Sequence, residues 1–296
     1  MRVIDRIVGA DPGPTLIVIG GMHGNEPAGV AAAQASFAAL RSSHASIRGE
    51  YVALRGNVAA LAARRRFFEQ DLNRMWTDAS LARARAGVDR SRETNEQIEL
   101  AHELDQIRAR ARGPMFVLDL HTTSARGVPF LVVGPTAEDR AFALQLPLPG
   151  IVGLEVVLEG VLTGWMSQIG CVAMAVEGGQ SGSPEAESNL SAVLCIALVA
   201  TGIVASMDNL GAARALLSRA RGDLPQLIEV ASRHALGPGH DFQMEPGFAN
   251  IHRTSSGALL AREAGAEIRA TFDGFVLLPL YQPEGRDGFF YGRSLS

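Results

Sequence analysis

The sequence predicts an α/β fold with a mainly parallel sheet flanked by helices, followed by a smaller β-rich domain. Two observations predict it. Over residues 1–207 of the 296-residue chain, short continuous apolar runs alternate with longer stretches of helical spacing. Over residues 208–296, glycines and prolines separate short strand-like pieces. We therefore expect two domains, 1–207 and 208–296.

Strands that are covered on both faces have continuous apolar sequences, whereas a helix needs a longer run with a period near 3.6 residues. The predicted strands of the first domain are Thr15–Gly20, Glu50–Leu54, Met115–Leu120, Phe130–Val133 and Cys171–Val176. The predicted helices are Pro27–Leu40, Glu93–Arg110 and Glu185–Met207. In the second domain the strand-like pieces are Leu227–Val230, Leu259–Ala261, Glu267–Ala270 and Phe275–Leu280.

The composition excludes several classes of protein. The net charge is −4 and no basic stretch dominates, so we expect neither a nucleic acid nor a membrane as partner. All 27 basic residues are Arg, which excludes a lysine nucleophile, a Schiff base and a P-loop lysine. Cys171 and Cys195 are too few for a disulfide framework or a Cys-rich zinc site, and we expect both in the core.

The N-terminus lacks a signal-peptide pattern. The most apolar run, Ala192–Ala205, is shorter than the roughly 20 residues of a membrane span and predicts a buried helix. We expect the protein in the cytoplasm.

Polar clusters follow three of the predicted strands, and sites in open α/β sheets form at the carboxyl ends of strands. His23 and Glu26 stand three residues apart on a Gly-bearing turn after the first strand, and His121 follows another strand. Two His and one Glu with an open position are a common catalytic zinc set. The His23–Glu26 pair alone is more often a polar turn with a helix-capping acid. The two further clusters favour the metal.

Two carboxylates accompany these residues. Asp119 lies two residues before His121, so the two side chains leave the same face of a strand. Asp119 either orients His121 or is a buried acid satisfied by backbone amides. Glu177 follows an apolar strand and precedes two glycines. It is either a catalytic base beside the metal or one partner of a salt bridge.

A further cluster extends from Arg64 to Arg74. For Arg64 and Arg65 we expect a solvated face. Asn73 and Arg74 together match a substrate carboxylate, because a guanidinium binds it with two hydrogen bonds. A further Arg near the metal would polarise the scissile carbonyl. The remaining histidines have no ligand-like neighbour in the sequence: His44, His102, His234, His240 and His252.

Four motifs occur in a fixed order between residues 20 and 179: Gly-Gly-Met-His-Gly-Asn-Glu, Asp-Leu-Asn-Arg, Asp-Leu-His-Thr-Thr and Glu-Gly-Gly. Together they resemble the aspartoacylase / succinylglutamate desuccinylase family, which is related to zinc carboxypeptidases. The C-terminal part also resembles the family's β-rich domain. Its stretches Asp273–Phe275 and Asp287–Phe290 are weaker support for this resemblance than the four motifs.

The resemblance implies a zinc-carboxypeptidase-like domain with one Zn²⁺ per chain, bound by His23, Glu26 and His121. It implies hydrolysis of the amide bond of an N-acyl amino acid or a similar small carboxylate-bearing amide by a promoted-water mechanism. Glu177 would be the acid/base, Arg66 would polarise the carbonyl, and Asn73 with Arg74 would hold the substrate carboxylate.

The sequence departs from the family pattern at one place. Aspartoacylase-like members have another Arg about ten residues before the general base, where Trp165, Ser167 and Gln168 occur here. This departure argues against N-acetyl-aspartate and succinylglutamate as substrates, unless Arg126 compensates. For the family's substrate-contacting tyrosine near the C-terminus, Tyr281 and Tyr291 are both candidates.

Two other functions stay open. One is a metallocarboxypeptidase for short peptides, which would need an open groove. The other is a zinc-dependent binder of a small ligand without catalysis, in which Glu177 and Arg66 would be surplus. The sequence leaves a homo-oligomer open as well.

Overall fold

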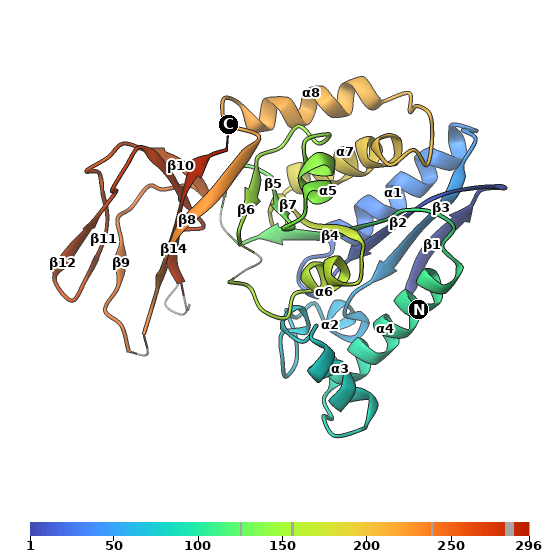
Figure 1. Ribbon diagram of the computed structural model, residues 1–296, viewed down its shortest axis with the longest axis horizontal. Coiled ribbons are helices and arrows are strands. Elements are labelled where there is room, and N and C mark those ends of the chain that lie inside the picture. Colours follow the sequence, from blue (N-terminus) through green and yellow to red (C-terminus); the bar gives the residue numbers. More distant parts are fainter. Residues whose placement is uncertain (125, 155–156, 238, 282–286, 296) are drawn as a thin grey trace.

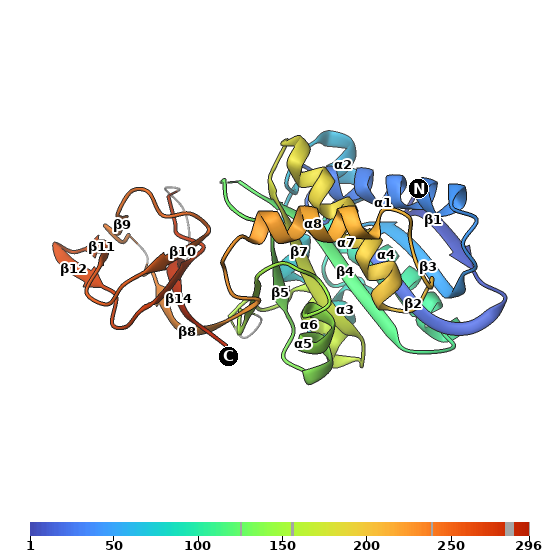
Figure 2. The same cartoon turned by 90° about the horizontal axis from the view of Figure 1, so that it is seen from above.

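The computed structural model describes residues 1–124, 126–154, 157–237, 239–281 and 287–295. Figure 1 shows an α/β part, with helices on both sides of a sheet, joined to a β-rich part on the left of the view. Figure 2, seen from above, shows the β-rich part projecting from the end of the α/β part. The predicted fold class is confirmed: a mixed α/β structure with a parallel core and a β-rich C-terminal region.

Four parallel strands form the centre of the large sheet: β3 (Arg48–Arg55), β2 (Asp11–Gly20), β4 (Met115–Thr123) and β7 (Val172–Gln180). β1 (Val3–Val8) pairs antiparallel with β3 at one edge. On the other side β5 (Phe130–Val133) pairs antiparallel with β7, and β6 (Gly150–Val152) follows. All five strands predicted for this part are present; β1 and β6 were not predicted.

β7 continues through Glu177 to Gln180, so the prediction that this strand ends at Val176 was wrong. Gly178, the first of the two glycines after Glu177, lies within the strand and allows close packing. A Cβ at Gly178 would lie 2.6 Å from Leu190 Cγ, so only glycine lets the helix after β7 lie this close to the strand.

The helices cover the sheet on both faces (Figure 1). One face carries α1 (Ala28–Ser42), α5 (Ala137–Ala143), α7 (Pro184–Ala200) and α8 (Leu210–Arg221). The other carries α2 (Val58–Ala63), the short 3₁₀ helix η1 (Leu72–Arg74), α3 (Asp78–Arg85), α4 (Arg92–Arg110) and α6 (Leu162–Gln168). Cys171 and Cys195 are unpaired and buried in the two cores on opposite faces.

α7 ends at Ala200, so the prediction of a helix as far as Met207 was wrong at its C-terminal end. Thr201 is the C-cap, and Gly202 has a φ of 80°, in the left-handed region where a helix cannot continue. Among the described residues, no helix combines the length and the apolar character that a membrane crossing requires.

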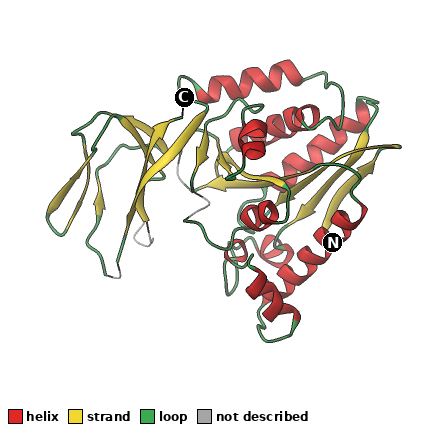
Figure 3. Ribbon diagram, in the orientation of Figure 1, coloured by secondary structure: helices red, strands yellow, loops and turns green. Residues whose placement is uncertain are grey.

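The C-terminal strands extend the same sheet. β8 (Leu227–Ala235) pairs parallel with β6, and β14 (Asp287–Ser294), β13 (Gly274–Leu277) and β10 (Ile251–Thr254) follow in antiparallel order. A separate three-stranded sheet contains β9 (Gln243–Met244), β11 (Leu259–Glu263) and β12 (Ala266–Arg269). The described part of this region has strands and loops but no α-helix beyond α8 (Figure 3).

A small hydrophobic core, which includes Leu260, Val276 and Phe289, lies within the C-terminal region. The division into 1–207 and 208–296 stays a prediction. α8 follows the expected boundary, yet its Ala213 and Leu217 belong to the core that α1 and α7 share.

α1 approaches the sheet unusually closely. A Cβ at Gly29, the second residue of α1, would lie 2.8 Å from Leu120 Cβ on β4. A Cβ at Gly20, at the end of β2, would lie 2.7 Å from the carbonyl carbon of Gly29. The start of α1 is therefore fixed against the ends of β2 and β4.

We predict that Gly29→Ala lowers the free energy of unfolding by about 1–3 kcal/mol, because the added methyl group overpacks this contact. Gly211→Ala is the matched control, since Gly211 is the second residue of α8 and nothing lies within 4 Å of a Cβ there. The control should gain up to about 1 kcal/mol from helix propensity. Urea denaturation measures both, and equal midpoints for the two variants would contradict the close-contact argument.

Candidate active site

The carboxyl ends of β2, β4 and β7 meet at one edge of the sheet. Gly20 is in register with Leu120, and His121 is in register with Glu177. The loop from β2 to α1 carries His23 and Glu26 over this edge, and a hydrogen bond from the Glu26 N–H to the His23 carbonyl, 3.1 Å long, closes the turn. Three segments far apart in the sequence therefore supply one site.

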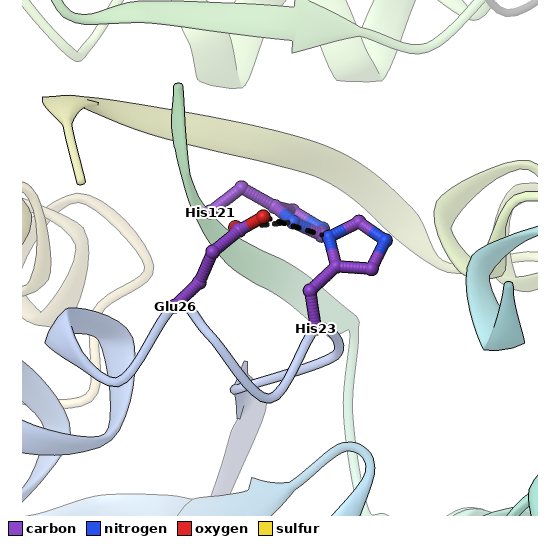
Figure 4. A group of neighbouring side chains, drawn as sticks. All are labelled: His23, Glu26 and His121. Atoms are coloured by element: carbon purple, nitrogen blue, oxygen red, sulfur yellow. Dashed lines mark hydrogen bonds and ion pairs between the residues drawn. The ribbon is translucent and has the colours of Figure 1, made fainter. Parts of the chain in front are cut away.

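His23, Glu26 and His121 point toward one another (Figure 4). His23 Nδ1 lies 2.9 Å from Glu26 Oε1, and His121 Nδ1 lies 3.2 Å from Glu26 Oε2. One ligand atom from each residue lies within 4.8 Å of the other two, and all three side chains are buried. Nδ1 of each imidazole faces the carboxylate, so two nitrogens and a carboxylate oxygen converge as the ligands of one divalent ion would.

The environment keeps this carboxylate ionised. Burial raises the pKa of Glu26, but hydrogen bonds from His121 and His23 outweigh it and hold the pKa well below its usual range. The backbone N–H of Thr122 donates a further hydrogen bond of 2.9 Å to Glu26 Oε2. Burial lowers the pKa of His121, but the charges of Asp119 and Glu26 raise it well above its usual value.

Each imidazole has a second carboxylate on its far nitrogen. Asp119 Oδ2 lies 2.9 Å from His121 Nε2, at ion-pair distance, but neither oxygen of Asp119 makes a hydrogen bond to a described residue, so the backbone amides considered as the alternative do not satisfy it either. Asp71 Oδ1 lies 3.0 Å from His23 Nε2. Sequence reasoning missed Asp71, although it opens the Asp-Leu-Asn-Arg motif. Such carboxylates fix the ring orientation of metal-binding histidines.

Glu177 lies on the face of the sheet that carries His121. Its side chain is half-buried, and its Oε2 is buried without a hydrogen-bond partner among the described residues. Burial raises the pKa of Glu177 to about 7, with His121 acting to lower it and Glu26 acting to raise it. The salt bridge to an arginine, considered as the alternative, does not form with any described residue.

Of the three consecutive arginines, Arg66 is the one that reaches the site. Its Nη1 lies 3.4 Å from Glu26 Oε1 and its Nη2 lies 3.1 Å from Asp71 Oδ2. Arg65 lies over the ring of Phe68, and neither Arg64 nor Arg65 lines the cavity described below.

Asn73 and Arg74 lie on η1 beside the metal-ligand candidates. Asn73 Nδ2 lies 3.3 Å from His121 Nε2, and its Oδ1 accepts a hydrogen bond of 2.9 Å from the Leu162 N–H at the start of α6. Arg74 Nη1 donates to the Asn73 carbonyl at 2.7 Å. Both residues are brought to the site, but the amide oxygen of Asn73 is already used by the chain.

A cavity of about 910 Å³ is lined by the three metal-ligand candidates and by Arg66, Asn73, Arg74 and Glu177, whereas Asp71 and Asp119 lie outside its wall. α6 contributes Thr163, Gly164 and Ser167 to its wall, whereas Trp165 and Gln168 do not line it. Ser167 therefore stands ten residues before Glu177, and its Oγ is buried without a hydrogen-bond partner among the described residues.

The C-terminal region closes another side of the cavity with Phe248, Asn250 and residues 278–281. Arg126 lines the cavity too. Of the two tyrosine candidates, Tyr281 is in the wall, whereas Tyr291 is buried elsewhere and donates a hydrogen bond to the Phe272 carbonyl. None of the five remaining histidines lines the cavity.

Comparisons with solved structures reveal the same fold. A succinylglutamate desuccinylase from Vibrio parahaemolyticus has a TM-score of 0.69 and 15% identity, over 98% of this chain and 86% of that chain. A succinylglutamate desuccinylase/aspartoacylase from Rhodobacter sphaeroides has a TM-score of 0.70 and 18% identity, over 98% of this chain and 88% of that chain. The product-bound ectoine utilization protein EutE (DoeB) from Ruegeria pomeroyi has a TM-score of 0.66 and 18% identity, over 98% of this chain and 88% of that chain.

No curated protein matches the sequence. The family model described as the succinylglutamate desuccinylase/aspartoacylase catalytic domain matches residues 12–191, which include all four motifs and every metal-ligand candidate. This chain therefore belongs to the succinylglutamate desuccinylase/aspartoacylase family.

Proposed function

We propose that this protein is a metal-dependent hydrolase that cleaves the amide bond of an N-acyl amino acid or a similar small carboxylate-bearing amide. One observation carries the proposal. Two imidazole Nδ1 atoms and the Glu26 carboxylate converge in a cavity that Glu177 and three arginines also line, and the buried Oε2 of Glu177 has no hydrogen-bond partner in the described part of the chain. The family membership supports a deacylase, and the similar solved structures include a succinylglutamate desuccinylase and a succinylglutamate desuccinylase/aspartoacylase.

The donor set fits a single Zn²⁺ per chain, held by His23, Glu26 and His121. When bound, the ion supplies Lewis-acid chemistry: it makes a water molecule more acidic and polarises an acyl carbonyl. Asp71 and Asp119 hold the two imidazoles in the ligand orientation through their far nitrogens.

Residues of the chain itself supply proton transfer, stabilisation of the developing charge and substrate binding. Glu177 takes the proton from the attacking water and returns one to the leaving amine. Its pKa of about 7 suits both steps, because a group that titrates near neutral pH exchanges protons readily in either direction. Arg66 stabilises the negative charge that develops on the acyl oxygen. Arg74, with Asn73, holds the carboxylate of the amino-acid half.

We expect hydrolysis when the protein is loaded with Zn²⁺ and offered N-acyl amino acids that vary in both halves. A chelator should abolish turnover, and added Zn²⁺, Co²⁺ or Mn²⁺ should restore it, because His and carboxylate ligands suit several divalent ions. Release of the free amino acid measures turnover. Hydrolysis of dipeptides alone would indicate a carboxypeptidase, and ligand binding with no turnover across the panel would indicate a non-catalytic binder.

Glu177→Gln should lower kcat by about 10²–10⁴-fold, the usual contribution of a general acid–base. The metal content should stay at the wild-type level, because Glu177 is not among the three ligand candidates. Turnover assays and elemental analysis on the same preparation check both parts. Survival of activity rules out the base role, and loss of the metal together with activity would point to a ligand role instead.

Arg74→Ala should lower kcat/KM by about 10–100-fold for an N-acyl amino acid, since a charge-assisted hydrogen bond is worth about 1.5–3 kcal/mol. The corresponding N-acyl amino acid amide, which has no carboxylate, should show little of this loss. Arg83→Ala is the control, because Arg83 is exposed, pairs with Asp89 and is not in the cavity wall. An equal loss on both substrates would argue against a carboxylate contact.

A further inference from the structure

The loop between α2 and η1 brings Arg66 and Asp71 to the candidate metal ligands. It begins at Arg64, which has a left-handed φ of 51° and ends α2. The loop contains no regular element, so its shape depends on what its backbone N–H groups contact.

Three consecutive backbone N–H groups of this loop donate to one buried carboxylate. Glu93, in the first turn of α4, accepts hydrogen bonds from the Phe68 N–H at 2.8 Å, the Glu69 N–H at 3.1 Å and the Gln70 N–H at 3.4 Å. The side-chain amide of Asn57 donates a fourth, 3.3 Å long. Glu93 is fully buried, so these four contacts account for its presence inside the protein.

All four partners are donors, so the site requires an ionised carboxylate. Burial raises the pKa of Glu93, but the backbone hydrogen bonds from Phe68 and Glu69 outweigh it and lower the pKa below its usual value. An amide in place of the carboxylate would turn an NH₂ group toward at least one N–H donor. The substitution Glu93→Gln therefore tests this requirement. Glutamine has nearly the same shape as glutamate, but its NH₂ group is a donor where the carboxylate has an acceptor oxygen.

Glu93 and Asn57, which together anchor the loop of residues 64–71, are also connected to the loop that carries His23. The Asn57 N–H donates to the Gly21 carbonyl at 2.9 Å, and the Gly24 N–H donates to the Arg66 carbonyl at 3.2 Å. The loop with Arg66 and the loop with His23 are thus linked to each other, and Glu93 fixes the loop with Arg66 to the start of α4.

We propose that Glu93 is a positioning residue that holds the loop of residues 64–71 so that Arg66 and Asp71 face Glu26 and His23. Its effect on turnover rests on the role given to Arg66 under the proposed function. Glu93 itself does not line the cavity, so it acts only through the loop.

The chain offers a matched control for a purely structural role. Glu96 lies one turn further along α4, is also buried, and accepts backbone hydrogen bonds from Val58 at 3.0 Å and Ala59 at 2.8 Å. It pairs with Arg2 as well. Glu96 therefore fixes the start of α2 and has no contact with the loop of residues 64–71.

The experiment compares Glu93→Gln with Glu96→Gln in the full-length, Zn²⁺-loaded protein. Glu93→Gln should lower kcat per bound metal at least tenfold with KM changed less than threefold, and Glu96→Gln should leave both constants unchanged. In the Arg66→Ala background, Glu93→Gln should lower kcat per bound metal by a smaller factor than in the wild type, because one of the two groups that it positions is gone and only Asp71 remains. Glu93→Asp, which keeps the charge, should retain more activity than Glu93→Gln and serves if that variant folds poorly.

Hydrogen exchange on peptides covering residues 64–71, in the metal-free protein, gives a readout independent of activity. Glu93→Gln should expose these amides, and Glu96→Gln should leave them protected. Unchanged protection in Glu93→Gln overturns the proposal, as does unchanged kcat where Arg66→Ala lowers it. If Arg66→Ala has no effect, the proposed function is wrong about Arg66, and lost protection in Glu93→Gln still supports the anchor.

Discussion

The carboxylate of Glu26 lies almost entirely out of water, and a charge buried there is unfavourable unless polar partners surround it. Its partners come from three separate segments: His23 from its own loop, His121 and the Thr122 N–H from the end of β4, and Arg66 from the loop after α2. The site therefore forms only if these segments meet at one point. The parallel register of β2, β4 and β7 and the close approach of α1 at Gly29 bring them there.

The strands and the residues at their ends could be predicted from the sequence because the physical signal is local. A strand buried on both faces has a continuous apolar sequence, and a polar residue directly after it must lie at the edge of the sheet. His23, His121 and Glu177 all follow such runs, which is why the sequence could group them. The position of Glu177 inside β7 was missed, because glycines that allow a helix to approach look the same in sequence as glycines that make a turn.

Other parts of the site leave no local signal that identifies their contacts. Asp71 acquires its contact with His23 only when two segments 48 residues apart meet. Glu93 binds backbone amides, and any sequence of residues at 68–70 other than proline would offer the same donors. The short helix α6 has no side-chain cap and contains Gly164, so neither periodicity nor capping marks it, although it forms one wall of the cavity. Tertiary contacts decide each of these features.

The groups of the candidate site differ in how firmly the fold holds them. His121 and Glu177 lie on central strands, whose backbone is fixed by hydrogen bonds within the sheet. Arg66 and Arg126 lie on irregular segments, whose backbone must be held by other contacts. Glu93 supplies one anchor. Asn250 supplies a second one, since its side chain donates to the Val128 carbonyl at 2.8 Å and accepts from the Val128 N–H at 3.1 Å, as a neighbouring strand would. The C-terminal region thus covers the cavity and also fixes the segment that leads out of β4 past Arg126. In the proposed mechanism, the sheet positions His121 and Glu177, whereas Glu93, a buried side chain outside that chemistry, positions the segment that carries Arg66.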